Sequence, residues 1–308
     1  MRILITGSSG TAGTRLFEQL LKRHEVTGVD TKRNTWHPYL NAHTINADLR
    51  KKKDLLKLPK NFDIVIHLAA NARVYELVKE PELAFDNILI HFNVLEFIRQ
   101  NNLKRIIFAS SRETYGNIAI RGTISEDMAK IENCESPYSA SKISGEAMTR
   151  SYSEVYGIDF IIARFSNVYG MYDNSDRVIP LWIRQTLRGD KLVVYGKKKF
   201  LDFTYIDDTI DGITKMIDQF DNAKGTTLNI AYGKGLDLVS VAQGIRKLLK
   251  AKNEIVIEES RPGEVWRFEG NITKAKELLG YEPETGIEDG LKKTVEWYKD
   301  FYSTGKDS

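Results

Sequence analysis

The chain has 308 residues, of which 42% are hydrophobic and 28% charged, and its 45 Lys and Arg residues against 42 Asp and Glu residues give a formal net charge of +3. This composition excludes an intrinsically disordered chain, and the small, dispersed charge excess argues against a nucleic-acid-binding protein. No run approaches the roughly 18 apolar residues that a membrane span needs, and the apolar run at residues 3–5 is too short for a signal peptide, so we expect a cytoplasmic protein with no membrane partner.

The single cysteine, Cys134, cannot form an internal disulfide and is not part of a His/Cys cluster with zinc spacing. We therefore expect an inert thiol and no metal site. The densest positive run, residues 50–53, opens an apparent helix, where a solvated helix face is favoured over a nucleic-acid patch.

Short apolar runs separated by amphipathic segments predict the fold class. They lie at residues 3–5, 26–29, 64–66, 106–108 and 160–162, with a sixth at 43–45. Alternating strands and helices are typical of a parallel sheet covered by helices on both faces. The sequence therefore predicts an α/β protein with a doubly wound parallel sheet of the Rossmann type.

The alternation becomes less regular after residue 167. Helices are expected near residues 178–188, 238–250 and 287–298 and from Asp207 onward, with strands at 192–195 and 228–231. We expect a dinucleotide-binding domain over residues 1–166 and a smaller C-terminal α/β lobe over 167–308. Such a lobe would bind substrate at the carboxyl ends of the strands.

A glycine-rich loop follows the first strand directly. The segment Thr6-Gly7-Ser8-Ser9-Gly10-Thr11-Ala12-Gly13 leads into an amphipathic helix. Glycines in this position let backbone amides approach a pyrophosphate, whose charge the helix N-terminus favours. The sequence predicts dinucleotide contacts at Gly7, Gly10, Thr11, Ala12 and Gly13.

Asp30 ends the second strand and bears on the choice of cofactor. An acidic side chain there accepts hydrogen bonds from ribose hydroxyls and repels a 2′-phosphate, which favours NAD over NADP. Lys32 and Arg33 follow closely and offer an alternative site for a 2′-phosphate. Taken alone, Asp30 would be a helix cap or turn residue, but beside the glycines it favours NAD.

Further cofactor contacts are expected after the next strands. Asp48 and Leu49 lie in a loop where the carboxylate can accept from the adenine amino group. Leu68, Ala69 and Ala70 follow the strand at 64–66 and let the cofactor lie close. His67, just before them, is expected to be a hydrogen-bonded core histidine without a chemical role.

Tyr138 and Lys142 form the candidate catalytic pair. On a helix, the Tyr-x-x-x-Lys spacing puts both side chains on one face, one turn apart. An adjacent ammonium favours the phenolate, and the sequence therefore predicts a general base that removes a proton from a secondary alcohol.

These motifs together resemble the NAD-dependent epimerase/dehydratase family of extended short-chain dehydrogenases/reductases. The likeness covers nearly the whole chain and is carried by residues 6–13, 67–70, 110–116, 138–142, 164–170, 202–208 and 261–264. It implies a catalytic triad of Ser111, Tyr138 and Lys142, with Ser111 bonded to the reacting oxygen. It also implies that Asn87 maintains the shape of the site, that Ser110 lies beside the cofactor, and that Asn167, Val178 and Tyr195 contact the substrate.

The sequence departs from the family's dehydratases after Ser111. Those enzymes carry Asp-Glu, where this chain has Arg112 and Glu113. Loss of the acid that protonates the leaving C6 hydroxyl makes 4,6-dehydration the weaker interpretation. Arg112 pairs either with a nearby acid or with a phosphate or carboxylate of the ligand.

The diphosphate site also departs from the family pattern. A family arginine aligns with Leu201, so Lys198 or Lys199 would replace its bidentate grip less rigidly. Arg261 remains for the diphosphate, and Glu264 takes a position that commonly bonds a ribose. Phe268 aligns with a residue that sets the size of the sugar pocket, and its bulk favours UDP-glucose over UDP-N-acetylglucosamine.

The resemblance implies a UDP-sugar 4-epimerase, acting on UDP-glucose/UDP-galactose or their N-acetyl counterparts by transient oxidation at C4 with tightly bound NAD. The alternatives are a nucleotide-sugar dehydratase, decarboxylase or reductase of the same family, and a non-catalytic NAD-sensing protein. By analogy alone, the helices around residues 83–98 and 138–156 imply a homodimer.

Overall fold

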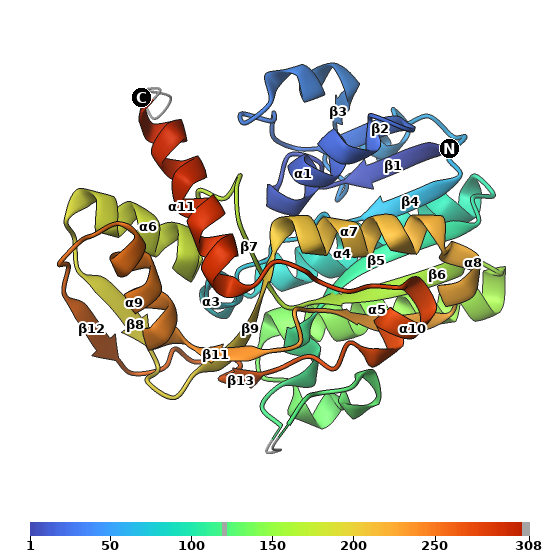
Figure 1. Cartoon of the computed structure of the whole chain (residues 1–308). Coiled ribbons are helices and arrows are strands. Elements are labelled where there is room, and N and C mark those ends of the chain that lie inside the picture. Colours follow the sequence, from blue (N-terminus) through green and yellow to red (C-terminus); the bar gives the residue numbers. More distant parts are fainter. Residues whose placement is uncertain (119–121, 304–308) are drawn as a thin grey trace.

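The computed structural model describes residues 1–118 and 122–303 and contains a seven-stranded parallel sheet in the order β10-β6-β5-β4-β1-β2-β3 (Figure 1). All six predicted strands belong to this sheet, which confirms the doubly wound Rossmann-type fold. The strands are β1 (Arg2–Thr6), β2 (Glu25–Asp30), β3 (Thr44–Asn46), β4 (Ile64–His67), β5 (Arg105–Ser111), β6 (Asp159–Phe165) and β10 (Thr226–Ile230).

Helices cover both faces of the sheet because its central strands are apolar on both sides. Ile3, Leu4 and Ile5 of β1 are at most 1% exposed. Helices α1 (Thr11–Leu20) and α7 (Ile206–Asp218) pack on one face, and α4 (Glu82–Gln100) and α5 (Pro137–Tyr156) on the other. Continuous apolar runs are therefore required at the strand positions that the sequence indicated.

Strand β10 and helix α7 come from the second half of the chain but complete the dinucleotide-binding sheet. Strand β10 pairs with β6, and α7 packs against α1, where Arg15 Nε donates to Asp207 Oδ1 at 2.6 Å. The chain thus crosses back over the expected division at residue 166. The amphipathic pattern of α7 and the apolar run of β10 fit either half of the molecule, and only pairing along the sheet decides between them.

The smaller lobe lies at the carboxyl ends of the strands (Figure 1). Trp182 anchors it, since its ring is fully buried and its Nε1 donates to Val193 O at 3.1 Å. Asp202 accepts backbone hydrogen bonds from Tyr232, Gly233 and Gly270 and so ties β9 to two loops. The lobe contains β7 (Asn167–Tyr169), α6 (Val178–Arg188), β8 (Leu192–Tyr195), β9 (Phe200–Tyr205), β11 (Gly235–Asp237), α9 (Leu238–Leu248), β12 (Ile255–Glu258), β13 (Arg267–Phe268) and α11 (Ile287–Ser303).

The remaining elements are short. They are the 3₁₀ helices η1 (Pro38–His43), η2 (Arg112–Tyr115), η3 (Glu126–Met128) and η4 (Ile131–Asn133), and the α-helices α2 (Lys52–Leu55), α3 (Val74–Lys79), α8 (Phe220–Ala223) and α10 (Thr273–Leu279). Within residues 1–118 and 122–303, every helix falls short of the length and apolar character needed to cross a membrane.

Helix α5 packs unusually close to the sheet. Ser136 caps its N-terminus by accepting from Ser139 N at 3.1 Å, and Pro137 stands in its first turn. At Gly145 a Cβ atom would lie 2.6 Å from Cζ of Phe108 on β5. Glycine is therefore needed there for the helix to reach the carboxyl end of β5.

We predict that Gly145→Ala destabilises the protein by about 1–3 kcal/mol, because the added methyl group overlaps the Phe108 ring and overpacks the core. Gly244→Ala, on helix α9, is the matched control. A Cβ at Gly244 would meet only Leu291 Cδ1, at 3.4 Å. The control should gain up to about 1 kcal/mol from better helix propensity. Urea unfolding measures both changes, and equal stabilisation of the two variants would contradict the close packing of α5.

Candidate active site

The glycine-rich loop lies between β1 and α1. Gly7 has a φ of +73°, and a Cβ there would lie 2.8 Å from Ala69 Cα. A Cβ at Gly13 would lie 2.1 Å from Gly7 O, whereas one at Gly10 would meet nothing closer than Gly7 O at 3.4 Å. Packing therefore requires Gly7 and Gly13, while Gly10 leaves room for a ligand beside the helix N-terminus.

The N-terminus of α1 is suited to an anion. Gly10 provides no side-chain cap, and the first turn of α1 carries no acidic residue. The amides of Thr11 and Ala12 thus belong to an uncapped helix end of positive partial charge, which fits the pyrophosphate of NAD. Thr11 also donates through Oγ1 to Tyr172 O at 3.0 Å, which joins this loop to the start of the smaller lobe.

Asp30 lies at the end of β2, where the sequence predicted the ribose-binding acid. Its Oδ2 accepts from Ser9 N and its Oδ1 accepts from Lys32 N, both at 2.9 Å. The carboxylate thus fastens the glycine-rich loop to the turn after β2. Arg33, the other candidate for a 2′-phosphate, is exposed there.

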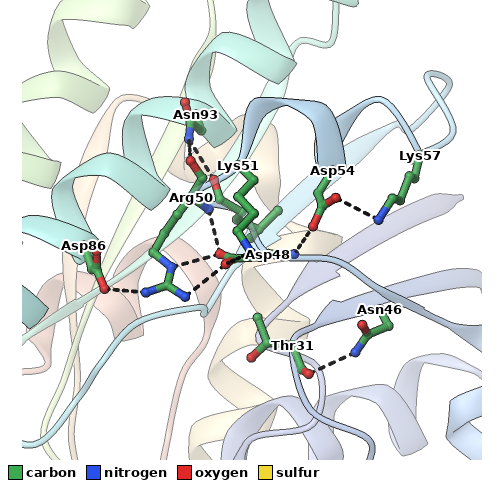
Figure 2. A network of polar contacts seen from close by, with 10 residues as sticks. Thr31, Asn46, Asp48, Arg50, Lys51, Asp54, Lys57, Asp86 and Asn93 are labelled. Carbon is green, nitrogen blue, oxygen red and sulfur yellow. Dashed lines mark hydrogen bonds and ion pairs between the residues drawn. The ribbon is translucent and has the colours of Figure 1, made fainter.

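Asp48 belongs to a network of ion pairs (Figure 2). Arg50 donates to both of its carboxylate oxygens at 2.9 Å and pairs with Asp86 at 2.8 Å, and the hydrogen bonds from Arg50 lower the pKa of Asp48 to about 2. Leu49 is buried, and its carbonyl accepts from Asn93 at 2.8 Å. The loop expected at the adenine is thus fixed to α4. The Asp-x-Arg spacing of Asp48 and Arg50 could have predicted their ion pair from the sequence.

Asn87 fixes the loop after β4, which contains Leu68, Ala69 and Ala70. Its Oδ1 accepts from Asn71 N at 2.7 Å, and its Nδ2 donates to Asn71 O at 3.0 Å and to Ser141 Oγ at 3.2 Å. Asn87 thus connects this loop to α5. Asn71, whose backbone takes part in both contacts, had no distinguishing signal in the sequence.

The structure brings Ser111, Tyr138 and Lys142 together at the carboxyl end of β5. Tyr138 is 7% exposed, and Ser111 hydrogen-bonds its phenol. Lys142 Nζ donates to Ala109 O at 2.7 Å and lies 5.8 Å from the centre of the Tyr138 ring. Ser111 at the end of β5 and the pair Tyr138 and Lys142 on α5 therefore lie together, although they come from two different elements.

The electrostatics of this site differ from the sequence-based expectation. Burial raises the pKa of Tyr138 to about 12, and only partial compensation comes from the hydrogen bond with Ser111. Burial also lowers the pKa of Lys142 to about 8. The expected stabilisation of the phenolate by the ammonium is outweighed here by the removal of both groups from water.

Glu146 supports the charge of Lys142 and was missed in the sequence. It raises the pKa of Lys142 against the effect of burial. Its carboxylate is held by Arg164, at 2.9 and 2.7 Å, and by the hydroxyl of Ser110. Glu146 follows Lys142 by four residues on α5, and this spacing could have predicted the contact from the sequence.

The expected sugar side of the site contains two ion pairs, one buried and one partly buried. Arg112 pairs with Glu113 at 2.8 Å, and its Nε donates to Asn167 Oδ1 at 3.2 Å. Lys199 pairs with Glu264, which sequence comparison had placed at a ribose. Arg112 therefore has the nearby acid that was one of its two expected partners.

Arg261 lies between the two halves of the molecule. Its guanidinium is 3.9 Å from the centre of the Tyr195 ring and 4.7 Å from that of Tyr75. An open cavity of about 810 Å³ lies on this side, lined in part by Lys198 and Ser260.

Three further positions that the sequence analysis placed near the substrate differ from one another in how far they are exposed. Val178 begins α6 and is half-buried, and Leu201 is buried on β9. Phe268 is fully buried and stacks on Tyr115 with ring centres 5.6 Å apart. The structure therefore places Phe268 in the core and not on the surface of the sugar pocket, and its bulk gives no guide to the sugar.

We predict that Lys142→Met changes how stability depends on pH. Because the pKa of Lys142 is lower in the folded than in the unfolded chain, the unfolded state binds more protons between about pH 8 and 10.5, and the wild type gains stability across that window. The variant lacks this gain. The free energy of unfolding of the wild type minus that of the variant should therefore rise by roughly 1–3 kcal/mol from pH 7 to pH 10.5. Urea unfolding at both pH values measures it, and an unchanged difference would contradict the burial of the ammonium.

Comparisons with known proteins agree with this geometry. The family described as the NAD dependent epimerase/dehydratase family matches residues 3–231. A putative UDP-glucose 4-epimerase of Methanocaldococcus jannaschii is 31% identical, over 96% of this chain and 98% of that protein. A UDP-N-acetyl-alpha-D-glucosaminuronate decarboxylase of Bacillus cytotoxicus is 32% identical, over 97% of this chain and 98% of that protein.

A solved structure extends the likeness to three dimensions. The UDP-glucuronic acid 4-epimerase from Bacillus cereus, in complex with UDP-glucuronic acid and NAD, has a TM-score of 0.90 and 29% identity, covering 98% of this chain and 100% of that chain. The family match spans the glycine-rich loop, the Ser111, Tyr138 and Lys142 site and the final strand of the sheet. The chain therefore belongs to the NAD-dependent epimerase/dehydratase family and is an enzyme whose cofactor is NAD.

Proposed function

We propose that the enzyme inverts the configuration at C4 of the sugar in a UDP-sugar. The observation that carries this proposal is the convergence of Ser111, Tyr138 and Lys142 beside a loop suited to a dinucleotide. UDP-sugars enter the proposal from similar proteins, whose names and bound ligands include UDP-glucose and UDP-glucuronic acid.

The residues of the site act on the C4 hydroxyl. Tyr138 takes its proton, and the Ser111 hydroxyl holds the same oxygen in line with the phenol. NAD, held by the glycine-rich loop, would supply a reversible acceptor for the C4 hydride, so that no net oxidation would occur. Tyr138 then gives the proton back to the C4 oxygen after the sugar has presented its other face. Tyr138 must be a phenolate to accept that proton and is a neutral phenol until it gives the proton back. The buried ammonium of Lys142 stabilises the phenolate form.

The rest of the site holds the nucleotide end still while the sugar turns. Arg261 and Lys198 are the cations proposed for the diphosphate, and Arg261 stacks on Tyr195. The family resemblance adds Tyr195 and Val178 as proposed substrate contacts. The stacking of Arg261 between two tyrosines keeps its guanidinium oriented. This grip would keep the ligand from dissociating while it is oxidised.

Decarboxylation of a UDP-uronate is the second candidate. A decarboxylase of this family is 32% identical to the chain, and Glu113 supplies a buried carboxyl group beside Ser111. Dehydration is less favoured, because Arg112 stands where the proton donor would be needed. An epimerase returns an isomer of equal mass, whereas a decarboxylase releases carbon dioxide, and mass spectrometry of the product separates the two.

We predict that Tyr138→Phe lowers kcat by at least about 100-fold, because the site loses the group that moves the C4 proton. NAD binding should persist, since the glycine-rich loop is untouched. Tyr156→Phe, at the end of the same helix and partly exposed, is the matched control and should keep full activity. Turnover is measured with UDP-glucose and UDP-glucuronate, and wild-type rates in the Tyr138 variant would refute the assigned base.

We also propose a homodimer formed through α4 and α5. These helices expose large apolar side chains, namely Phe85 (65% exposed), Val155 (65%) and Tyr156 (46%). Covering such side chains is favourable, and the two helices that carry them pack side by side.

We predict that Phe85→Asp and Val155→Asp shift the dimer to monomers, because each places a charge in the apolar contact. Leu56→Asp is the control, since Leu56 is 77% exposed but lies outside α4 and α5. Sedimentation velocity measures the change. A wild-type protein that sediments as a monomer would rule out the dimer.

A further inference from the structure

The guanidinium of Arg112 keeps one nitrogen without a partner. Its side chain is 10% exposed, Nη2 pairs with Glu113 Oε1 at 2.8 Å, and Nε donates to Asn167 Oδ1 at 3.2 Å. Within the part of the chain that the structure describes, Nη1 of Arg112 and Oε2 of Glu113 are buried and have no hydrogen-bond partner. Buried polar atoms of charged groups are costly to leave unpaired, so both indicate a ligand.

These two atoms belong to residues that adjoin the proposed catalytic residues. Arg112 follows Ser111 directly, and the charges of Arg112 and Glu113 both act on the Tyr138 phenol. The carbons next to C4 of a hexose are C3, which bears a hydroxyl, and C5, which bears C6. A carboxylate in this neighbourhood is therefore the C6 carboxylate of a hexuronate.

The charges around Glu113 decide which ligand fits. The groups that face it are Arg112, Lys199 and Glu264, together with the backbone amide of Val265. Lys199 is already paired with Glu264, so Glu113 alone balances Arg112. Burial raises the pKa of Glu113, and the charge of Glu264 adds to that effect. Glu113 therefore gives up its charge more readily than a carboxyl group in water, and a second anion would favour this further.

Protonation of Glu113 would turn the pair into two donors. Arg112 Nη1 and the new Glu113 O–H would each donate to one oxygen of a carboxylate, and the guanidinium would keep one counter-charge. A hydroxyl group could accept a hydrogen bond from that cation but would leave its charge unbalanced. The charge balance favours the carboxylate, because a buried cation is stable only when it is paired.

We propose that Arg112 and Glu113 bind the C6 carboxylate of the sugar, so that the substrate is a UDP-hexuronate and its binding takes up one proton on Glu113. This inference rests on the proposed function and narrows its substrate class. No covalent bond to carbon forms or breaks in this step, and the proton comes from solvent.

The first test compares kcat/KM for UDP-glucuronate and UDP-glucose with the NAD-loaded enzyme. The wild type should favour the uronate by at least about tenfold, and Arg112→Met should reduce that preference by at least about tenfold, since the charge-assisted bonds are lost. Arg23→Met is the matched control, because Arg23 is an exposed residue in the turn after α1 and should leave the preference unchanged. Inversion of UDP-glucose with no preference for the uronate would overturn this inference and leave the epimerase proposal standing.

The second test does not depend on turnover. Calorimetry of UDP-glucuronate binding to NAD-loaded Tyr138→Phe enzyme, in buffers of different ionisation enthalpy, should show uptake of about one proton near neutral pH. UDP-glucose should show none, and Glu113→Gln should remove the uptake while the uronate still binds. Uronate binding without proton uptake would overturn the role of Glu113. If neither UDP-sugar binds, the proposed function itself fails.

Discussion

The active site depends on an ammonium that is buried where water cannot solvate it. Lys142 reaches the carboxyl end of β5 only because Gly145 lets α5 lie against Phe108. Its charge is tolerated because Glu146 lies one turn away, itself fixed by Arg164. A buried cation without such a partner would lose its proton, and the phenol of Tyr138 would then have no positive group behind it. The close packing of the helix and the buried ion pair are therefore parts of one arrangement.

Two histidines behind Lys142 complete that arrangement. His67 and His91 are stacked with ring centres 5.1 Å apart, and His67 bonds Thr6 Oγ1 at 2.7 Å. Burial, with a further contribution from Lys142, lowers the pKa of both, that of His91 to about 3. They therefore stay neutral at physiological pH. A charged histidine here would compete with Lys142 for the single acid at Glu146.

The parts of the molecule that the sequence predicted are those coded by short segments. The apolar runs of β1 and β4 and the Tyr-x-x-x-Lys spacing on α5 specify their own structure locally, and each was found where it was expected. The return of β10 to the sheet was not predictable, because its apolar run is compatible with either half of the chain. The sequence also did not show which of the charged residues in the site form ion pairs with each other. That Lys199 would pair with Glu264 and leave Arg112 to Glu113 depends on contacts across the fold.

Residue 112 limits the chemistry more than the catalytic triad does. In the proposed mechanism the triad assists oxidation of a C4 hydroxyl whatever follows, so it does not by itself distinguish epimerisation from elimination or decarboxylation. An acid next to Ser111 could protonate a leaving group, but a guanidinium remains charged at every physiological pH and gives no proton. Its pairing with Glu113 also restrains the one carboxyl group that could replace the missing donor. Because this substitution weakens the route to elimination, it supports the proposed reversible transfer of a hydride to and from C4.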